Sequence, residues 1–200
     1  NCCPVSKTSR DIGNNIYSCT GDLTDYNAVT FLFDFTEKKL GPVSLLVNNA
    51  ATSYSDTFLS QDLSSKGFSS KSLSEKSFFA NFAINTQGAA ICMQEFVNRY
   101  TKSSLTQGSI INISTDSARG GFPGEVSYQA SKSALESYTR SAAAELGPIG
   151  IRVNAIEPGP VQTGWINKEL ESQCIENIPL RRLGTPGDIS NCVKFLASDE

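Results

Sequence analysis

The sequence contains no histidine, and this absence removes several kinds of catalytic site. Serine proteases and their relatives use a Ser-His-Asp triad, and most zinc sites include histidine ligands. Proton transfer by this protein therefore falls to tyrosine, lysine, aspartate, glutamate or cysteine side chains. We predict no metal cofactor.

A surplus of positive charge and a long apolar run are also missing. The 200 residues hold 17 Lys and Arg against 20 Asp and Glu, for a net charge of −3. Nucleic-acid-binding domains usually carry a basic surplus, and a membrane-spanning helix needs about 20 apolar residues. We therefore predict one globular domain over residues 1–200, with neither a nucleic-acid nor a membrane partner.

The six cysteines are scattered and form no C-x-x-C motif. Such a pattern favours free thiols in a reducing compartment over a disulfide framework, so we predict a cytoplasmic protein. The chain begins at Asn1 without a methionine, a start that is compatible with a removed targeting peptide.

Short apolar segments rich in β-branched residues alternate with longer helical segments. We expect strands at 16–19, 43–47, 109–113 and 151–156, and helices at about 24–39, from 74 onward, at 125–146 and from 186 onward. This alternation predicts an α/β fold with a doubly wound parallel sheet covered on both faces. Ligands of such folds bind at the carboxyl ends of the strands.

The second of these helices follows a capping-box signature at residues 72–75. Its apolar residues fall on roughly one stripe, which predicts a single core-facing side: Phe78, Phe82, Ala89, Met93 and Phe96.

Ten serines crowd into residues 52–77, which we interpret as an insertion near the substrate pocket. Two roles stay open for it. It is a mobile surface loop, or it is a lid over the pocket, since it leaves the sheet at a carboxyl end.

Tyr128 and Lys132 lie four residues apart on the helix expected at 125–146, so they share a face. An ammonium beside a phenol favours the phenolate and lowers its pKa from about 10. A tyrosine tuned in this way could exchange a proton near neutral pH. The spacing by itself also fits an ordinary exposed helical pair.

Six motifs in order resemble the short-chain dehydrogenase/reductase family, over nearly the whole chain. They are Asp22-Leu23, Asn48-Asn49-Ala50-Ala51, Asn85-Thr86-Gln87-Gly88, Ile111-Asn112-Ile113-Ser114-Thr115, Tyr128-Gln129-Ala130-Ser131-Lys132 and Pro158-Gly159-Pro160-Val161-Gln162-Thr163. The run from Pro179 to Glu200 is also similar to the family's late region. The resemblance implies a Rossmann fold.

The resemblance also implies catalytic roles. Tyr128 would be the general acid in reduction and the base in oxidation. Lys132 would lower the pKa of Tyr128 and hold the nicotinamide ribose. Thr115 would hydrogen-bond the substrate carbonyl, with Ser117 as the next candidate, and Asn85 would anchor a water in a proton relay.

Contacts with the cofactor follow from the same resemblance, and we expect NADP(H) more than NAD(H). Asp22 and Leu23 would meet the adenine ring. The other expected contacts are Asn49, Ala50, Ala51, Tyr128, Lys132, Pro158, Gly159, Val161 and Thr163.

The sequence departs from the family pattern in four places. Thr115 stands where the family usually has serine, and Ala51 where it usually has glycine. No glycine-rich G-x-x-x-G-x-G turn precedes Asp22, and the last sheet strand expected after Glu200 is absent. We therefore expect a Rossmann fold that is incomplete at both ends. The position that separates NAD from NADP falls in the absent part.

The predicted activity is hydride transfer between NAD(P) and a small-molecule carbonyl or alcohol. The motifs at 158–165 and 179–184 look most like 3-oxoacyl-[acyl-carrier-protein] reductases, so a 3-oxoacyl thioester or a similar ketone is the expected substrate. A pteridine-reductase-like enzyme and a non-catalytic dinucleotide-sensing or scaffold protein stay as alternatives.

Trp165 either lines the substrate pocket or is a core or interface aromatic. Family members commonly pair their long helices, so we expect a homotetramer or homodimer built on the helices of Tyr128 and Asn85.

Overall fold

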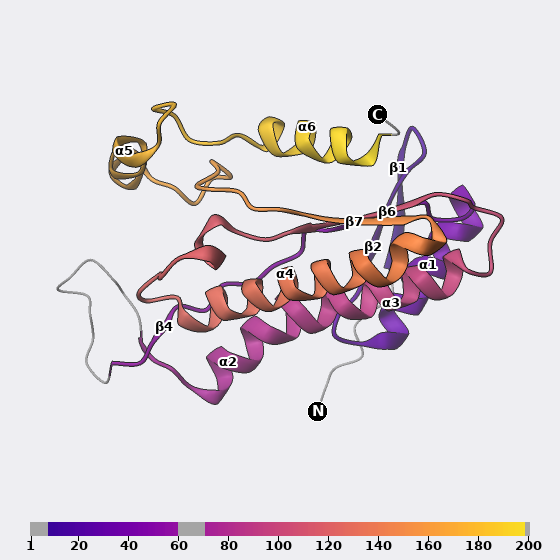
Figure 1. Ribbon diagram of the computed structural model, residues 1–200, viewed down its shortest axis with the longest axis horizontal. Coiled ribbons are helices and arrows are strands. Elements are labelled where there is room, and N and C mark those ends of the chain that lie inside the picture. The colour runs from indigo at the N-terminus through magenta and orange to yellow at the C-terminus, as the bar shows by residue number, and fades with distance from the viewer. Residues whose placement is uncertain (1–7, 60–70, 199–200) are drawn as a thin grey trace.

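A computed structural model describes residues 8–59 and 71–198 of the chain (Figure 1). Its strands are β1 (Thr8–Gly13), β2 (Ile16–Thr20), β3 (Leu45–Asn48), β4 (Asp56–Thr57), β5 (Lys71–Ser72), β6 (Gly108–Ile113) and β7 (Ile151–Ile156). Its α-helices are α1 (Tyr26–Leu40), α2 (Glu75–Phe82), α3 (Ala89–Tyr100), α4 (Val126–Leu146), α5 (Lys168–Asn177) and α6 (Pro186–Ala197). Within these residues no helix is long and apolar enough to cross a membrane.

The central sheet is parallel and has the order β3-β6-β7. Its register aligns Leu46 with Ile110 and Ile110 with Val153, so these three side chains share one face. Helix α3 lies between β3 and β6 in sequence, and α4 lies between β6 and β7. The structure thus confirms the predicted α/β fold with a parallel sheet and crossover helices.

The hydrophobic core lies between this face and helices α1, α3 and α4. Its buried members are Val29, Phe33, Cys92, Met93, Phe96, Tyr100, Ile110, Ile151 and Val153. In Figure 1 these helices lie on one side of β6 and β7, and α6 lies on the other.

The opposite face of the sheet is less covered than the sequence predicts. Helix α6 contacts it, where the Arg152 guanidinium donates to the Leu196 carbonyl at 2.7 Å. Leu45 and Val47 nevertheless keep 39% and 36% of their surface exposed. The prediction of a buried strand at 43–47 is therefore wrong for one of its faces, because among the described residues β3 has a strand neighbour on one side only and α6 does not reach it.

The strand expected at 16–19 exists as β2, but it pairs antiparallel with β1 and not with the central sheet. Asn14 and Asn15 join the two strands with φ angles of 53° and 59°. Two consecutive left-handed residues form the tight turn that matches hairpin twist, and asparagine tolerates it well. Gly13-Asn14-Asn15 is a turn signature that the pattern of apolar residues does not reveal.

A π-helical segment, Ala83–Gly88, joins α2 to α3 without a break. Extra residues in a π turn rotate everything that follows about the helix axis. Ala89, Met93 and Phe96 consequently face the core, whereas Phe78 is exposed. The prediction of a single core-facing stripe is therefore wrong: the apolar residues of α2 and those of α3 face in different directions.

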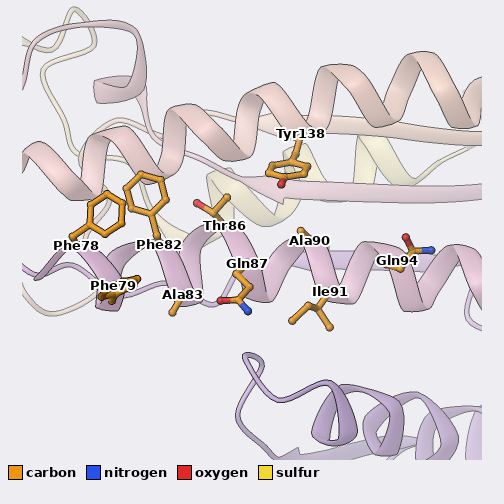
Figure 2. Close-up of a pocket in the computed structure, with 10 residues that line it drawn as sticks. All are labelled: Phe78, Phe79, Phe82, Ala83, Thr86, Gln87, Ala90, Ile91, Gln94 and Tyr138. Carbon is orange, nitrogen blue, oxygen red and sulfur yellow. The ribbon is translucent and has the colours of Figure 1, made fainter. Parts of the chain in front are cut away.

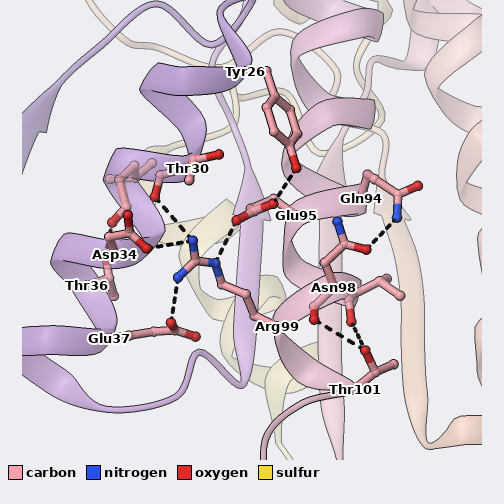
Figure 3. A network of polar contacts seen from close by, with 12 residues as sticks. Tyr26, Thr30, Asp34, Thr36, Glu37, Gln94, Glu95, Asn98, Arg99 and Thr101 are labelled. Atoms are coloured by element: carbon pink, nitrogen blue, oxygen red, sulfur yellow. Dashed lines mark hydrogen bonds and ion pairs between the residues drawn. The ribbon is translucent and has the colours of Figure 1, made fainter.

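Helices α1 and α3 are joined by one arginine (Figure 3). The Arg99 guanidinium lies 2.8 Å from Asp34, 2.6 Å from Glu37 and 2.7 Å from Glu95. The Tyr26 hydroxyl donates to the other Glu95 oxygen at 3.0 Å. This network holds together α1 and α3, the helices that precede and follow β3 in the sequence.

Candidate active site

The carboxyl ends of β6 and β7 continue together into the loops that carry the predicted site. The Ser114 amide donates to the Ile156 carbonyl at 2.8 Å, and the Asp116 amide donates to the Pro158 carbonyl at 3.0 Å. These bonds bring the segment of Thr115 beside the segment of Pro158.

Helix α4 places Lys132 under these loops. The side chain is 2% exposed, and its ammonium donates to the Ile113 carbonyl at 2.7 Å. Burial lowers the pKa of Lys132 to about 8. The ammonium has three donors, and the carbonyl of Ile113 uses one of them.

Tyr128 lies one turn before Lys132, at the third residue of α4. Burial raises the pKa of Tyr128, and the carboxylates of Glu125 and Asp116 raise it further, while a hydrogen bond with the Thr115 side chain lowers it. The predicted lowering by Lys132 is therefore not found in this structure. Burial and the two carboxylates raise the pKa of Tyr128 more than its hydrogen bond lowers it. The Lys132 ammonium donates to the Ile113 carbonyl instead.

Thr115 and Ser117, the two candidates for the hydroxyl that polarises the substrate, lie together. Their hydroxyl oxygens are 3.1 Å apart, and the Ser117 amide donates to the Thr115 hydroxyl at 3.4 Å. The hydrogen bond with Tyr128 involves Thr115. The two hydroxyls therefore stay candidates for the same role, and Thr115 is the one that interacts with Tyr128.

Asn85 lies in the π-helical segment and is 1% exposed. Its amide oxygen accepts from the Thr52 amide at 2.8 Å. Its amide nitrogen donates to the Thr52 carbonyl at 2.8 Å and to the Ser131 hydroxyl at 3.0 Å. Both amide N–H groups are thus engaged, so a relay water at this side chain would have to donate to its oxygen. Asn85 ties the loop after β3 to α4.

Two further residues hold the same loop, and the motif comparison missed both. The Asn81 amide oxygen accepts from the Tyr54 amide at 3.1 Å, and its nitrogen donates to the Tyr54 carbonyl at 3.0 Å. Asp56 accepts a hydrogen bond from the Ser127 amide of α4 at 2.8 Å. The four-residue spacing of Asn81 and Asn85 was the only sequence signal, because the other partners are distant along the chain.

The residues that follow β3 and β7 are accessible at the carboxyl end of the sheet. Asn49, Ala50 and Ala51 are exposed at the carboxyl end of β3, where a dinucleotide can approach the backbone. A Cβ at Gly159 would lie 3.2 Å from an Asp116 carboxylate oxygen, so a larger residue there would require a small shift of the Asp116 side chain.

The remaining predicted contacts lie at the edges of this surface. Val161 pairs with Gly184 in a parallel bridge, and Thr163 is exposed just beyond it. At the end of β2 the Asp22 carboxylate accepts from both the amide and the hydroxyl of Thr24, at 2.9 and 2.7 Å. Leu23 packs against the hydrophobic core.

Two other expectations concern the rim of the pocket. Trp165 is 64% exposed, so it is not a core aromatic. Residues 60–70 of the serine-rich insertion lie outside the described residues. Across residues 8–59 and 71–198 no group of three or more His, Cys, Asp or Glu side chains could hold a metal ion.

The parallel sheet with its tyrosine, lysine and threonine at one edge defines an oxidoreductase-like α/β protein, and comparison with known proteins identifies the family. Residues 4–200 match the family model described as Enoyl-(Acyl carrier protein) reductase. The chain belongs to the short-chain dehydrogenase/reductase family, as its motifs predicted.

Three relatives show the extent of the similarity. An uncharacterised oxidoreductase, YjdA, from Bacillus subtilis is 39% identical over 90% of this chain and 66% of its own length. The 3-oxoacyl-[acyl-carrier-protein] reductase FabG from Staphylococcus aureus is 31% identical over 94% and 72%. The structure of ElxO with NADP bound superposes with a TM-score of 0.78 at 30% identity, over 90% and 70%. The chain thus spans about two thirds of the length of such relatives.

Proposed function

We propose that the protein is an NAD(P)-dependent oxidoreductase that transfers hydride between the nicotinamide and a carbonyl or alcohol carbon. One observation carries the proposal. Tyr128 lies one helical turn from the buried Lys132 ammonium, which donates to the Ile113 carbonyl two residues before Thr115. That arrangement provides a proton and a carbonyl-binding hydroxyl at one point.

The bound dinucleotide supplies or accepts the hydride. The Thr115 hydroxyl donates a hydrogen bond to the substrate oxygen and stabilises the negative charge that develops there. The Tyr128 hydroxyl donates its proton to the same oxygen in reduction and takes it back in oxidation. Lys132 holds the ribose with the ammonium donors that the Ile113 carbonyl does not use.

The surroundings of Tyr128 suit the role of a general acid. A raised pKa keeps the phenol protonated at neutral pH, and a protonated phenol is the form that a general acid needs. Oxidation would require the phenolate, which the nearby carboxylates of Glu125 and Asp116 disfavour.

NADP(H) is the cofactor that we propose. The support is the ElxO structure, 30% identical to this chain, which contains NADP. The residues that would contact a 2′-phosphate are not among the predicted contacts of this sequence, so the preference rests on that similarity.

The proposed substrate is a 3-oxoacyl thioester or a similar ketone. The 31% identity to FabG supports it, together with the motifs at 158–165 and 179–184. A pteridine substrate and a non-catalytic sensing role are the alternatives that an assay separates.

The test follows the absorbance of NADPH and NADH with an acetoacetyl thioester, a pteridine and simple ketones, using the protein and its Tyr128→Phe variant. We expect NADPH oxidation with the thioester or a ketone, and its loss in the variant. Turnover of the pteridine alone would replace the substrate assignment. Dinucleotide binding without turnover of any substrate would contradict the oxidoreductase proposal.

We also propose that the protein assembles as a homodimer or homotetramer through the helices of Asn85 and Tyr128. An apolar groove of about 460 Å³ lies along these helices, with Tyr138 of α4 on one side and the aromatic rings of α2 on the other (Figure 2). The Phe78 and Phe82 rings stack at 4.5 Å. Exposed aromatic side chains of this kind mark protein–protein interfaces.

The cytoplasm is the compartment that we propose. The described cysteines, Cys19, Cys92, Cys174 and Cys192, are all free thiols, and proteins of reducing compartments keep their thiols free.

A further inference from the structure

The first turn of α4 carries Tyr128 but has no local cap. Glu125 occupies the N-cap position, and its side chain makes no capping hydrogen bond. The first N–H groups of a helix have no partner within the helix, so an uncapped first turn frays. Tyr128 is the third residue of this turn, and its hydroxyl must stay beside Thr115.

Asp56 provides the missing cap from another part of the chain. Its Oδ1 accepts from the Ser127 amide at 2.8 Å, across 71 residues of sequence. Asp56 is 0% exposed, and its backbone forms a parallel bridge with Glu125. The amide that it holds belongs to the residue directly before Tyr128.

Asp56 is itself held on both sides. Strand β4 pairs Asp56 with Lys71 of β5. Before it, Asn81 bonds both backbone groups of Tyr54, and Asn85 bonds both backbone groups of Thr52. The carboxylate therefore has a defined place against α4.

The burial of Asp56 indicates a role beyond packing. Among the described residues, its Oδ2 and the Ser127 hydroxyl are buried without hydrogen-bond partners. Native proteins leave few such atoms, and each needs an explanation. The positive end of the helix dipole stabilises a carboxylate at the N-terminus of α4, which is where the Asp56 side chain lies.

We propose that Asp56 is a positioning residue for Tyr128: its hydrogen bond to the Ser127 amide fixes the first turn of α4 and so holds the phenol against Thr115. The proposal rests on the function proposed above. Asp56 would then affect the reaction rate although it lies outside the motifs of Tyr128, Lys132 and Thr115.

The test compares Asp56→Ala and Asp56→Asn with Asp25→Ala. Asp25 is a matched control, because it caps α1 through the corresponding amide, that of Asn27, at 2.9 Å. We expect Asp56→Ala to lower kcat by about 10- to 100-fold, the scale of a small misplacement of a catalytic group, with the affinity for NADPH unchanged. Asp56→Asn keeps an acceptor and should restore kcat to within about 3-fold of the parent. Asp25→Ala should lower the melting temperature but not kcat.

A second readout keeps this proposal separate from the proposed reaction. The ionisation of Tyr128 is followed by tyrosinate absorbance, as the difference between each protein and its Tyr128→Phe partner. Fraying exposes the phenol, so Asp56→Ala should lower the pKa of Tyr128 toward its ordinary value, and Asp25→Ala should not. A parent protein without turnover overturns the proposed reaction, and the titration still decides the role of Asp56.

Three results would overturn the positioning role. One is an unchanged kcat with an unchanged Tyr128 titration in folded Asp56→Ala. Another is an equal loss of kcat in the Asp25→Ala control. If Asp56→Ala does not fold, a loss of kcat greater than about 10-fold in folded Asp56→Asn would contradict it, because that variant retains the hydrogen bond.

Discussion

At the scale of single residues, the neighbours of Tyr128 decide its protonation state. The sequence pointed to Lys132 as the group that tunes it, because a four-residue spacing on a helix is visible in sequence. The structure instead gives the largest influence to burial, followed by the carboxylate of Glu125. Burial and the contacts of Asp116 depend on chain segments that meet only in the folded protein, so the sequence could not rank them.

The effect of Glu125 on Tyr128 is testable by its charge. Replacing Glu125 with glutamine removes a nearby negative charge, so the pKa of Tyr128 should fall. In the oxidative direction Tyr128 acts as the base, and the ascending limb of the rate profile, where the rate increases with pH, should therefore move to lower pH. Glu145→Gln, an exposed change near the other end of α4, is the control and should leave the profile in place. A profile shifted to higher pH would contradict the electrostatic assignment.

Thr115 and Ser117 lie close enough that mutation must separate them. Thr115→Ala removes the hydroxyl bonded to Tyr128 and should lower kcat by about 100- to 1,000-fold, the usual effect of losing one such donor. Thr115→Ser keeps the hydroxyl and should retain most activity. Ser117→Ala is the matched control. If Ser117→Ala caused the larger loss in steady-state turnover, the roles of the two residues would be exchanged.

The buried ammonium of Lys132 makes stability depend on pH. Its pKa falls from its ordinary value of 10.5 to about 8 in the folded protein, so between these values the unfolded chain binds more protons. The free energy of unfolding should therefore rise with pH from about 8 to 10, by about 1–3 kcal/mol. Lys132→Met should abolish that rise, measured by urea unfolding of both proteins at pH 7 and pH 10. An equal rise in both would assign it to another group.

At the scale of elements, a chain of buried polar groups fixes α4 against the sheet. The Asn48 amide nitrogen donates to the Asn112 amide oxygen at 2.8 Å. The Asn112 nitrogen donates to the Thr139 hydroxyl at 2.8 Å, and that hydroxyl donates to the Leu135 carbonyl at 2.8 Å. The first two bonds join β3 to β6 and β6 to α4, so they hold the three elements together.

Removing Asn112, the middle residue of this series of hydrogen bonds, should destabilise the protein more than a comparable substitution nearby. Asn112→Ala leaves the Asn48 amide without its acceptor in a buried site, which should cost about 2–4 kcal/mol. Ser109→Ala, on the other face of the same strand, should cost less than about 1 kcal/mol, because its bond to the Leu196 carbonyl is long at 3.4 Å. Denaturant unfolding measures both. Equal losses of stability in the two variants would show that the hydrogen bonds of Asn112 do not contribute more than an ordinary polar contact.

Sequence reasoning located α4, β7 and α6 well because their signals are local. Apolar periodicity, a Pro after Thr185 and the Gly147-Pro148 stop all act within a few residues. The π-helical segment could not be predicted in this way. It depends on Asn85 and Thr86 reaching Ser131 on another helix, and those contacts exist only after α2 and α4 pack.

At the scale of the whole molecule, the sequence predicted the parallel sheet and its crossover helices. It did not predict how unevenly the sheet would be covered. Helices α1, α3 and α4 bury one face, while α6 covers only part of the other. Coverage depends on how many elements lie over each face, and residue spacing along a strand cannot reveal it.

The apolar groove along α2 and α4 carries the last prediction. Phe79 borders this groove and is 58% exposed, so an aspartate there costs the monomer little. If the groove is the contact between copies, the new charge must be buried on assembly without a partner, and the oligomer should dissociate to the monomer. Leu40→Asp is the matched control, because Leu40 is similarly exposed, at 53%, but ends α1 away from the groove. Size-exclusion chromatography with light scattering distinguishes the species. A monomeric Phe79→Asp beside an oligomeric Leu40→Asp would locate the interface on these helices, and an unchanged mass in both would place it elsewhere.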